Sequence, residues 1–172
     1  IPHKIEIMKF LDKIDESCSL IGAANTIVNI DGILKGYNTD MDGFLEPFKK
    51  KEIEIINKKI LLLGAGGAAR AIVAGFAKEK AKSITIANRT LENAEKLSEF
   101  AGKIGLTADV LKIENVNESA KNYDIIVNAT SIGLKNEESV ISLDGINEKT
   151  IVYDIVYMPM NTDFIKKAKE NN

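Results

Sequence analysis

The stretch that decides the fold is KILLLGAGGAAR, residues 59–70. Lys59–Leu63 has the near-continuous apolar run of a buried β-strand and leads directly into glycines. The turn Gly64-Ala65-Gly66-Gly67-Ala68-Ala69 then fits the pattern G-x-G-x-x-A. In this pattern the first glycine permits a tight turn, the second lets the backbone approach a pyrophosphate, and the small last residue lets a helix pack closely. Because a helix N-terminus also attracts phosphate, the stretch predicts a dinucleotide site over residues 64–68; the alternative is a turn that serves packing alone.

Beyond this stretch, apolar strands and helices alternate to the end of the chain. The expected strands cover residues 83–87, 108–113, 123–128 and 150–156, and the expected helices cover 68–80, 91–101, 116–121 and 162–169. Runs such as Ile125-Ile126-Val127 are apolar on both faces, which indicates a parallel sheet covered on both sides. We therefore expect an α/β fold with a Rossmann-type, doubly wound parallel sheet.

The chain before residue 58 has a different pattern. It predicts a helix over 4–11, two strands over 25–30 and 33–37 joined at Asp31-Gly32, and a helix over 42–50. The length of 172 residues fits one domain and a fraction. We expect the remnant of a smaller α/β substrate domain in residues 1–43, a connecting helix and linker in 44–57, and a nucleotide-binding domain in 58–172.

The end of the second nucleotide-domain strand, Asn88-Arg89-Thr90, bears on the choice of cofactor. An NAD site carries an acidic residue for the ribose hydroxyls about 20 residues past the glycines, and none is present here. Arg89 can instead pair bidentately with a 2′-phosphate, although it could also be a solvated arginine at a helix start. Of 23 basic residues only Arg70 and Arg89 are arginine, and both fall in turns expected to face phosphate. We therefore predict NADP rather than NAD.

Composition excludes several classes of partner and site. With 23 basic and 25 acidic residues the net charge is −2, which argues against nucleic acid or an anionic membrane as the main partner. The single Cys18 forms no intrachain disulfide, and with the single His3 it cannot complete a four-ligand zinc site. No apolar run reaches the roughly 18 residues of a membrane span, and no signal-peptide pattern begins the chain. We expect a cytoplasmic protein without a metal.

Polar clusters recur in the first forty residues, at Pro2-His3-Lys4, at 22–26 and at 36–40. Each has a plain structural alternative, because Lys4 is one of 21 lysines and both Asn25 and Asp40 could cap secondary structure. Two later strands end in NATSIG, residues 128–133, and DIVY, residues 154–157, at the ligand side expected of a parallel sheet. Tyr157 could contact substrate or be a partly buried aromatic.

Seven motifs in one order, IPHK, GAANT, YNTD, GAGGAAR, NRT, NATSIG and DIVY, make the whole chain resemble the shikimate dehydrogenase family. The resemblance implies NADP-dependent interconversion of shikimate and 3-dehydroshikimate, in the chorismate pathway of aromatic amino acid biosynthesis, in a cleft between two α/β domains. It implies a catalytic pair, Lys4 and Asp40, with Asn25 and Tyr157 as further substrate contacts. The cofactor contacts that it implies are Gly64, Ala65, Gly66, Gly67, Ala68, Asn88, Arg89, Thr90, Leu91, Glu92, Asn93, Ile155 and Glu16.

The chemistry of the reaction fits this pair. Hydride transfer from a secondary alcohol needs a base for the hydroxyl proton, and the reverse reaction needs an acid. A lysine beside a carboxylate can hold that proton, and its charge stabilises a developing alkoxide. The nicotinamide itself supplies the hydride chemistry.

The chain also departs from the family. Family members are longer at both ends, so we expect an internal fragment that binds NADP but turns over slowly or not at all. Met158 stands where the family often has asparagine, and the effect of this difference is left open. Whether the protein forms a homodimer is also left open.

Three alternatives compete with this interpretation. A quinate/shikimate dehydrogenase is disfavoured by the missing acidic residue at 88–90. A glutamyl-tRNA reductase-like protein shares the GAG and NRT turns but needs a catalytic cysteine and an RNA-binding region. A non-catalytic NADP-binding protein is disfavoured by the presence of Lys4 and Asp40.

Overall fold

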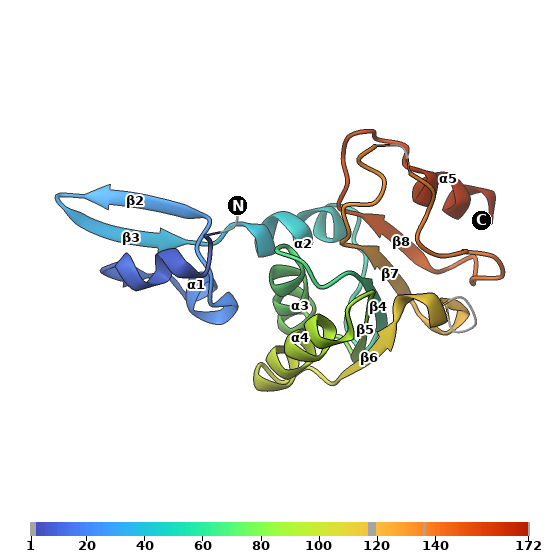
Figure 1. The fold of residues 1–172 in the computed structure, drawn as a ribbon, viewed down its shortest axis with the longest axis horizontal. Coiled ribbons are helices and arrows are strands. Elements are labelled where there is room, and N and C mark those ends of the chain that lie inside the picture. The colour runs from blue at the N-terminus through green and yellow to red at the C-terminus, as the bar shows by residue number, and fades with distance from the viewer. Residues whose placement is uncertain (1–2, 117–119, 136, 172) are drawn as a thin grey trace.

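The computed structural model describes residues 3–116, 120–135 and 137–171 and contains two separate sheets (Figure 1). A three-stranded sheet has the order β1-β3-β2, and a five-stranded sheet has the order β6-β5-β4-β7-β8. Pro2 of the first polar cluster lies outside the described residues, as does part of the helix expected over 116–121. The described end of that segment is a short 3₁₀ turn, η3 (Ala120–Asn122).

The five-stranded sheet confirms the predicted doubly wound parallel architecture. Its strands are β4 (Lys59–Leu63), β5 (Ser83–Asn88), β6 (Ala108–Lys112), β7 (Ile125–Asn128) and β8 (Ile151–Asp154), and every neighbouring pair is parallel. The strand order reverses at β4, which lies between β5 and β7. In open parallel sheets ligands bind at the carboxyl ends of the strands beside such a reversal, so the turn after β4 lies where a site is expected.

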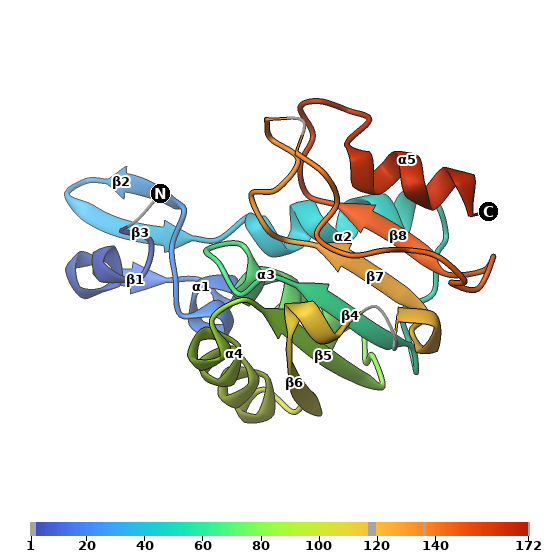
Figure 2. The same cartoon turned by 45° about the vertical axis from the view of Figure 1, so that its right-hand side comes forward.

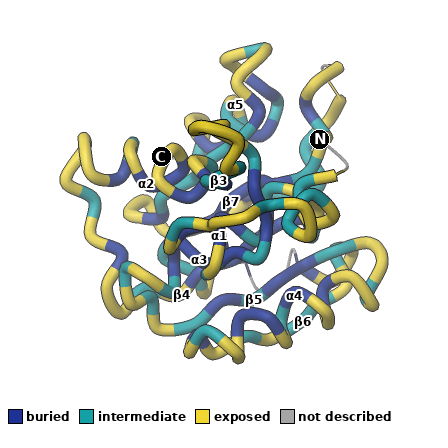
Figure 3. The backbone as a smooth tube through the Cα atoms, turned by 90° about the vertical axis from the view of Figure 1, so that its left-hand side faces the viewer, coloured by how far each residue is buried: buried dark blue, intermediate teal, exposed yellow. Residues whose placement is uncertain are grey.

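Helices cover both faces of this sheet (Figures 1 and 2). α2 (Asp40–Lys50), α3 (Ala69–Lys78) and α4 (Leu91–Lys103) contribute to one core cluster, whereas α5 (Asp163–Glu170) contributes to the other. Along β4 the side chains alternate, with Ile60 and Leu62 in the first cluster and Leu61 and Leu63 in the second. The buried stretches of the chain accordingly run through the large sheet (Figure 3).

An aromatic cluster attaches α2 to the large sheet. The ring of Phe44 lies 5.1 Å from that of Phe76 on α3 and 5.3 Å from that of Tyr153 on β8. Phe48 stacks on Tyr153 at 5.5 Å. The helix that the sequence marks as a connector is therefore packed into the layer over the sheet; the division into domains stays a prediction.

The N-terminal part contains elements that the sequence predicts and two that it does not. The hairpin of β2 (Thr26–Ile30) and β3 (Ile33–Tyr37) is confirmed, and the expected first helix is a shorter 3₁₀ helix, η1 (Glu6–Phe10). The unpredicted elements are β1 (Lys13–Ile14), which pairs with β3, and α1 (Glu16–Ile21), which Asp15 caps. Both are too short to produce a recognisable hydrophobic period.

Among the residues that the structure describes, no helix is both long enough and apolar enough to cross a membrane.

Candidate active site

A cleft of 480 Å³ opens between the N-terminal part and the nucleotide turn. The N-terminal part lines it with Lys4, Asn38 and Asp40, and the glycine turn lines it with Ala65, Gly66 and Gly67. Asn93 and Lys96 of α4 complete the wall on the side of the second strand. The structure thus brings Lys4 and a glycine turn that starts sixty residues later in the sequence into one concave site.

The first two glycines of the turn are required for different reasons. Gly64 has a φ of 101°, and a Cβ there would lie 3.0 Å from Thr130 Cγ2 and 3.1 Å from the backbone of Ala129. At Gly66 a Cβ would meet nothing within 4 Å. Packing therefore explains Gly64 but not Gly66. The open space above Gly66 belongs to the cleft, and a bare backbone facing such a space suits a pyrophosphate.

The turn after β5 presents polar groups and leads directly into α4, whose Asn93 lines the cleft. Asn88 Nδ2 donates to the Thr90 carbonyl at 2.8 Å and closes the turn. Arg89 is exposed and has no ion-pair partner among the described residues. Thr90 occupies the N-cap position of α4, but its hydroxyl makes no capping hydrogen bond. The guanidinium and the hydroxyl are thus both available to a ligand at a helix N-terminus.

The first turn of α4 contributes unequally to the cleft. Asn93 lines the cleft, whereas the carboxylate of Glu92 accepts a hydrogen bond from Lys96 at 2.6 Å. That contact lowers the pKa of Glu92. Leu91 begins the helix and is half-buried.

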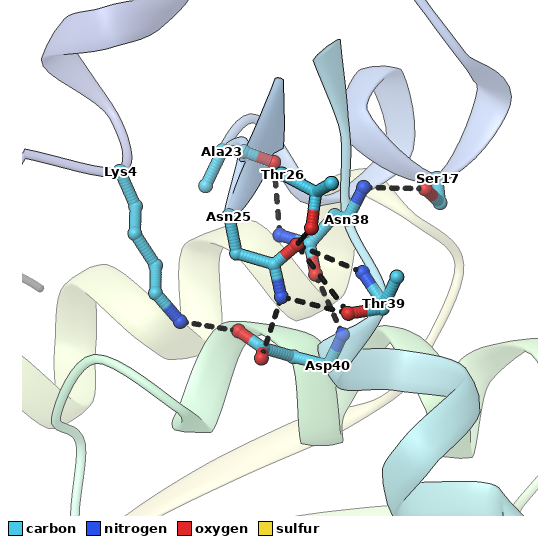
Figure 4. Close-up of polar contacts among 8 residues, drawn as sticks. All are labelled: Lys4, Ser17, Ala23, Asn25, Thr26, Asn38, Thr39 and Asp40. Atoms are coloured by element: carbon cyan, nitrogen blue, oxygen red, sulfur yellow. Dashed lines mark hydrogen bonds and ion pairs between the residues drawn. The ribbon is translucent and has the colours of Figure 1, made fainter. Parts of the chain in front are cut away.

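Lys4, Asn25 and Asp40 meet on the opposite wall (Figure 4). Lys4 Nζ lies 2.5 Å from Asp40 Oδ2, and Asn25 Nδ2 donates to Asp40 Oδ1 at 2.8 Å. The side chains of Lys4 and Asp40 are 27% and 31% exposed, so the ion pair is sheltered but remains open to the cleft. A lysine and a carboxylate in this arrangement can exchange a proton with a hydroxyl group that enters the cleft.

The structure corrects in part the expectation that both arginines face phosphate. Arg70 Nε donates to the Ile21 carbonyl at 2.9 Å, and its guanidinium lies 4.0 Å from the centre of the Phe100 ring. Burial lowers the pKa of Arg70. Although Arg70 lines the cleft, its guanidinium is held by protein groups and ties α3 to the end of α1 and to α4.

The expected site residues that line the cleft are Lys4, Asp40, Ala65, Gly66, Gly67 and Asn93. Outside the lining, Asn25 bonds to Asp40, and Gly64, Ala68 and residues 88–92 belong to the turns that lead to the lining residues.

Tyr157, Ile155 and Glu16 belong to other segments. Tyr157 is 80% exposed beyond the end of β8, and Ile155 packs against the first core cluster. Glu16 lies at the start of α1, in a separate hollow that also includes Lys78 of α3. The start of α1 lies beside the C-terminal end of α3, whereas the glycine turn leads into the N-terminal end of that helix. Met158, also beyond β8, is 70% exposed.

The polar ends of β7 and β8 bond to each other rather than to the cleft. Asp154 accepts hydrogen bonds from Asn128 Nδ2 at 3.0 Å and from Thr162 Oγ1 at 2.6 Å. Asn128 and Thr162 are each 1% exposed. This hydrogen-bond network holds the ends of β7 and β8 together, so polar residues of the NATSIG and DIVY motifs have a structural role.

Sequence reasoning missed Asn38 and Lys96 as cleft residues. Asn38 is only 3% exposed, yet it adjoins the cleft beside Asp40. The signal that could have found Asn38 is its position in YNTD, between an expected strand and an expected helix. An amide buried at such a junction must form hydrogen bonds with neighbouring groups. Lys96 follows Asn93 by one helical turn, a spacing that places both on one face of α4.

Cys18 has none of the properties of a catalytic nucleophile. It is fully buried, and burial, reinforced by the charge of Asp15, raises the pKa of its thiol to about 11. At neutral pH such a thiol is protonated and inert. The feature that a glutamyl-tRNA reductase-like protein requires is therefore absent from the described part of the chain, which holds the only cysteine.

Comparison with known proteins agrees with this geometry. Residues 48–162 match the family model described as Shikimate / quinate 5-dehydrogenase. Over 172 residues the chain is 76% identical to the shikimate dehydrogenase (NADP(+)) of Nitrosopumilus maritimus, covering all of this chain and 63% of that protein. The chain thus spans less than two thirds of this relative's length.

Two solved structures are also similar. One is shikimate 5-dehydrogenase from Listeria monocytogenes in complex with shikimate and NAD, with 37% identity, a TM-score of 0.90, and 99% of this chain and 63% of that chain covered. The other is shikimate 5-dehydrogenase from Thermus thermophilus in complex with NADP(H) and shikimate, with 32% identity, a TM-score of 0.78, and 100% and 62% covered. Because the family model matches most of its length, the chain belongs to the shikimate / quinate 5-dehydrogenase family.

Proposed function

We propose that the whole protein is an NADP-dependent oxidoreductase that interconverts shikimate and 3-dehydroshikimate. The observation that carries the proposal is the shared cleft, in which the Lys4–Asp40 ion pair faces the glycine turn. The family supports the reaction class, and the relative in Nitrosopumilus maritimus supports the choice of substrate and cofactor.

In this proposal the ion pair handles the proton of the reacting hydroxyl. The substrate hydroxyl enters beside Lys4 Nζ and Asp40 Oδ2, and the pair takes up its proton as the carbon is oxidised. The positive charge of the Lys4 ammonium stabilises the developing alkoxide, and in the reverse direction the pair returns the proton to the carbonyl oxygen. Asn25 keeps the carboxylate of Asp40 oriented through its 2.8 Å hydrogen bond. The contact with substrate hydroxyls that the family resemblance implies for Asn25 would replace its 3.1 Å hydrogen bond to Thr39 Oγ1.

The other wall of the cleft fits an NADP molecule. The backbone at Gly66 and Gly67 has room for a pyrophosphate, and Arg89, Thr90 and Asn93 offer donors for a 2′-phosphate. When bound, NADP supplies the nicotinamide that accepts or returns the hydride. For the remaining expected contacts, Ile155 and Glu16 with the cofactor and Tyr157 with substrate, the support is the family resemblance alone, because none of the three lines the cleft.

A quinate-oxidising enzyme is the second candidate, because the matching family model covers both quinate and shikimate. The division into domains, a cytoplasmic location and a homodimer are further proposals that rest on the sequence alone. For the isolated 172 residues we propose NADP binding with impaired turnover, since they cover 63% of the Nitrosopumilus maritimus relative.

Removing the lysine of the ion pair tests the chemistry. We expect the whole protein to form NADPH from shikimate, followed at 340 nm, and to do so faster than from quinate. Lys4→Ala should lower kcat by about 100-fold or more, because it removes the proton-handling group. The control is Lys9→Ala, an exposed lysine in η1. Full activity of Lys4→Ala would contradict the proton-transfer role, and absence of shikimate turnover by the parent would contradict the proposed substrate.

Adding a methyl group to the glycine turn tests the phosphate cradle. Gly66→Ala should raise the Kd for NADP by about 10-fold or more, because its Cβ occupies the space proposed for the pyrophosphate. The melting temperature without ligand should not fall, since no atom lies within 4 Å of that Cβ. Gly102→Ala, which adds a methyl group at an equally open position in α4, is the control. Unchanged NADP binding by Gly66→Ala would rule out a phosphate at this position.

Truncating the exposed arginine tests cofactor selection. Arg89→Ala should weaken NADP binding by about 10- to 100-fold, the value of one or more hydrogen bonds to a charged group. NAD binding should change little, because NAD lacks the 2′-phosphate. Both affinities can be measured by isothermal titration calorimetry on the same preparation. Equal losses for the two cofactors, or tighter binding of NAD than of NADP by the parent, would contradict the assignment.

A further inference from the structure

Asn38 is a buried amide that connects the two polar motifs of the substrate side (Figure 4). It lies between the end of β3 and the start of α2 and is 3% exposed. Burying an amide costs free energy unless its groups are hydrogen-bonded, so its partners define what it does.

Each bond of Asn38 reaches a different segment. Its Nδ2 donates to the Ala23 carbonyl at 2.9 Å, and its Oδ1 accepts from the Asp40 backbone N–H at 3.0 Å. Its own backbone N–H donates to Ser17 Oγ at 3.1 Å, and that hydroxyl donates in turn to the carboxylate of Asp15 at 2.8 Å. The residue thus links the start of α2, the first turn of α1 and the loop at residues 22–25.

These bonds hold both partners of the ion pair. Asn38 holds Asp40 directly, through the backbone N–H of that residue. It holds Lys4 through the loop, because Ala24, next to the anchored Ala23, donates its N–H to the Lys4 carbonyl at 2.9 Å. A single side chain therefore fixes the separation of two backbone segments that lie 36 positions apart in the chain.

We propose that Asn38 is the positioning residue for the Lys4–Asp40 pair: it acts on the reaction by holding these two groups at transfer distance. This inference rests on the proposed function of the pair. It assigns Asn38 no contact with substrate or cofactor. A displacement of about 1 Å in reacting groups can cost about 100-fold in rate, so the bonds of Asn38 matter beyond their contribution to stability.

The test replaces one donor while keeping the shape of the side chain. Asn38→Asp retains the oxygen that accepts from Asp40 but places a second oxygen against the Ala23 carbonyl. In the whole protein we expect kcat with shikimate to fall by about 10- to 100-fold. The Kd for NADP should stay within about twofold, because the proposed NADP contacts lie on the other wall. The matched control is Asn29→Asp on the same hairpin, an exposed amide that accepts only from Gly32 N–H.

A double-mutant cycle separates positioning from simple loss of stability. If Asn38 acts through Asp40, the change Asn38→Asp should cost little further kcat in an Asp40→Asn background. If the kcat losses of Asn38→Asp and Asp40→Asn multiply in the double variant, the inference is overturned. Full kcat in Asn38→Asp, or a loss of NADP binding without a loss of kcat, would overturn it as well. The kcat values are compared at a temperature at which thermal melting curves show the same folded fraction for all variants.

A crystal structure of the Asn38→Asp variant tests the same inference without any substrate. We expect Lys4 Nζ and Asp40 Oδ2 to move apart from the 2.5 Å of the parent. An unchanged separation would overturn the positioning role even if the protein proved to act on a different substrate. Absence of shikimate turnover by the parent, with the pair displaced in the variant, would instead contradict the proposed function alone.

Discussion

At Gly64 the chain leaves β4 with a φ of 101° and passes so close to the residues after β7 that a Cβ would lie 3.0 Å from Thr130 Cγ2 and 3.1 Å from the backbone of Ala129. This close approach lets α3 start directly above the reversal of strand order. The bare backbone of Gly66 and Gly67 then faces open space, and Asn93 in the first turn of α4 lines the same space. The nucleotide wall of the cleft follows from that one turn.

The opposite wall depends on hydrogen bonds rather than on a sheet. The three-stranded sheet has only short strands, and its hairpin projects away from the large sheet (Figure 1). What orders its functional end is the set of bonds from Asn25 and Asn38 to Asp40. Arg70 connects this wall to the nucleotide wall, because it bonds to the end of α1 and lies against the ring of Phe100. The two walls therefore meet through the contacts of Arg70 and through apolar packing, since Ile21, Ala23 and Met41 belong to the same core cluster as α3 and α4.

Much of this could be predicted from the sequence, because strong local patterns specify it. The apolar run Lys59–Leu63 and the glycines after it determine strand, turn and helix, and the two-residue turn at Asp31-Gly32 determines the hairpin. Long-range contacts could not be predicted in the same way. The contacts of the Arg70 guanidinium with protein groups, the exposure of Tyr157 and the burial of Asn38 are examples. Each is determined by packing against segments that are distant in the sequence.

The central claim is that one cleft brings a hydroxylated substrate at the Lys4–Asp40 pair next to a dinucleotide at the glycine turn. A crystal structure of the whole protein with NADP and shikimate tests it most directly. We predict the pyrophosphate over Gly66 and Gly67, and a ring hydroxyl of shikimate within hydrogen-bond distance of both Lys4 Nζ and Asp40. Electron density for either ligand outside this cleft, with the cleft itself filled by water, would contradict the claim.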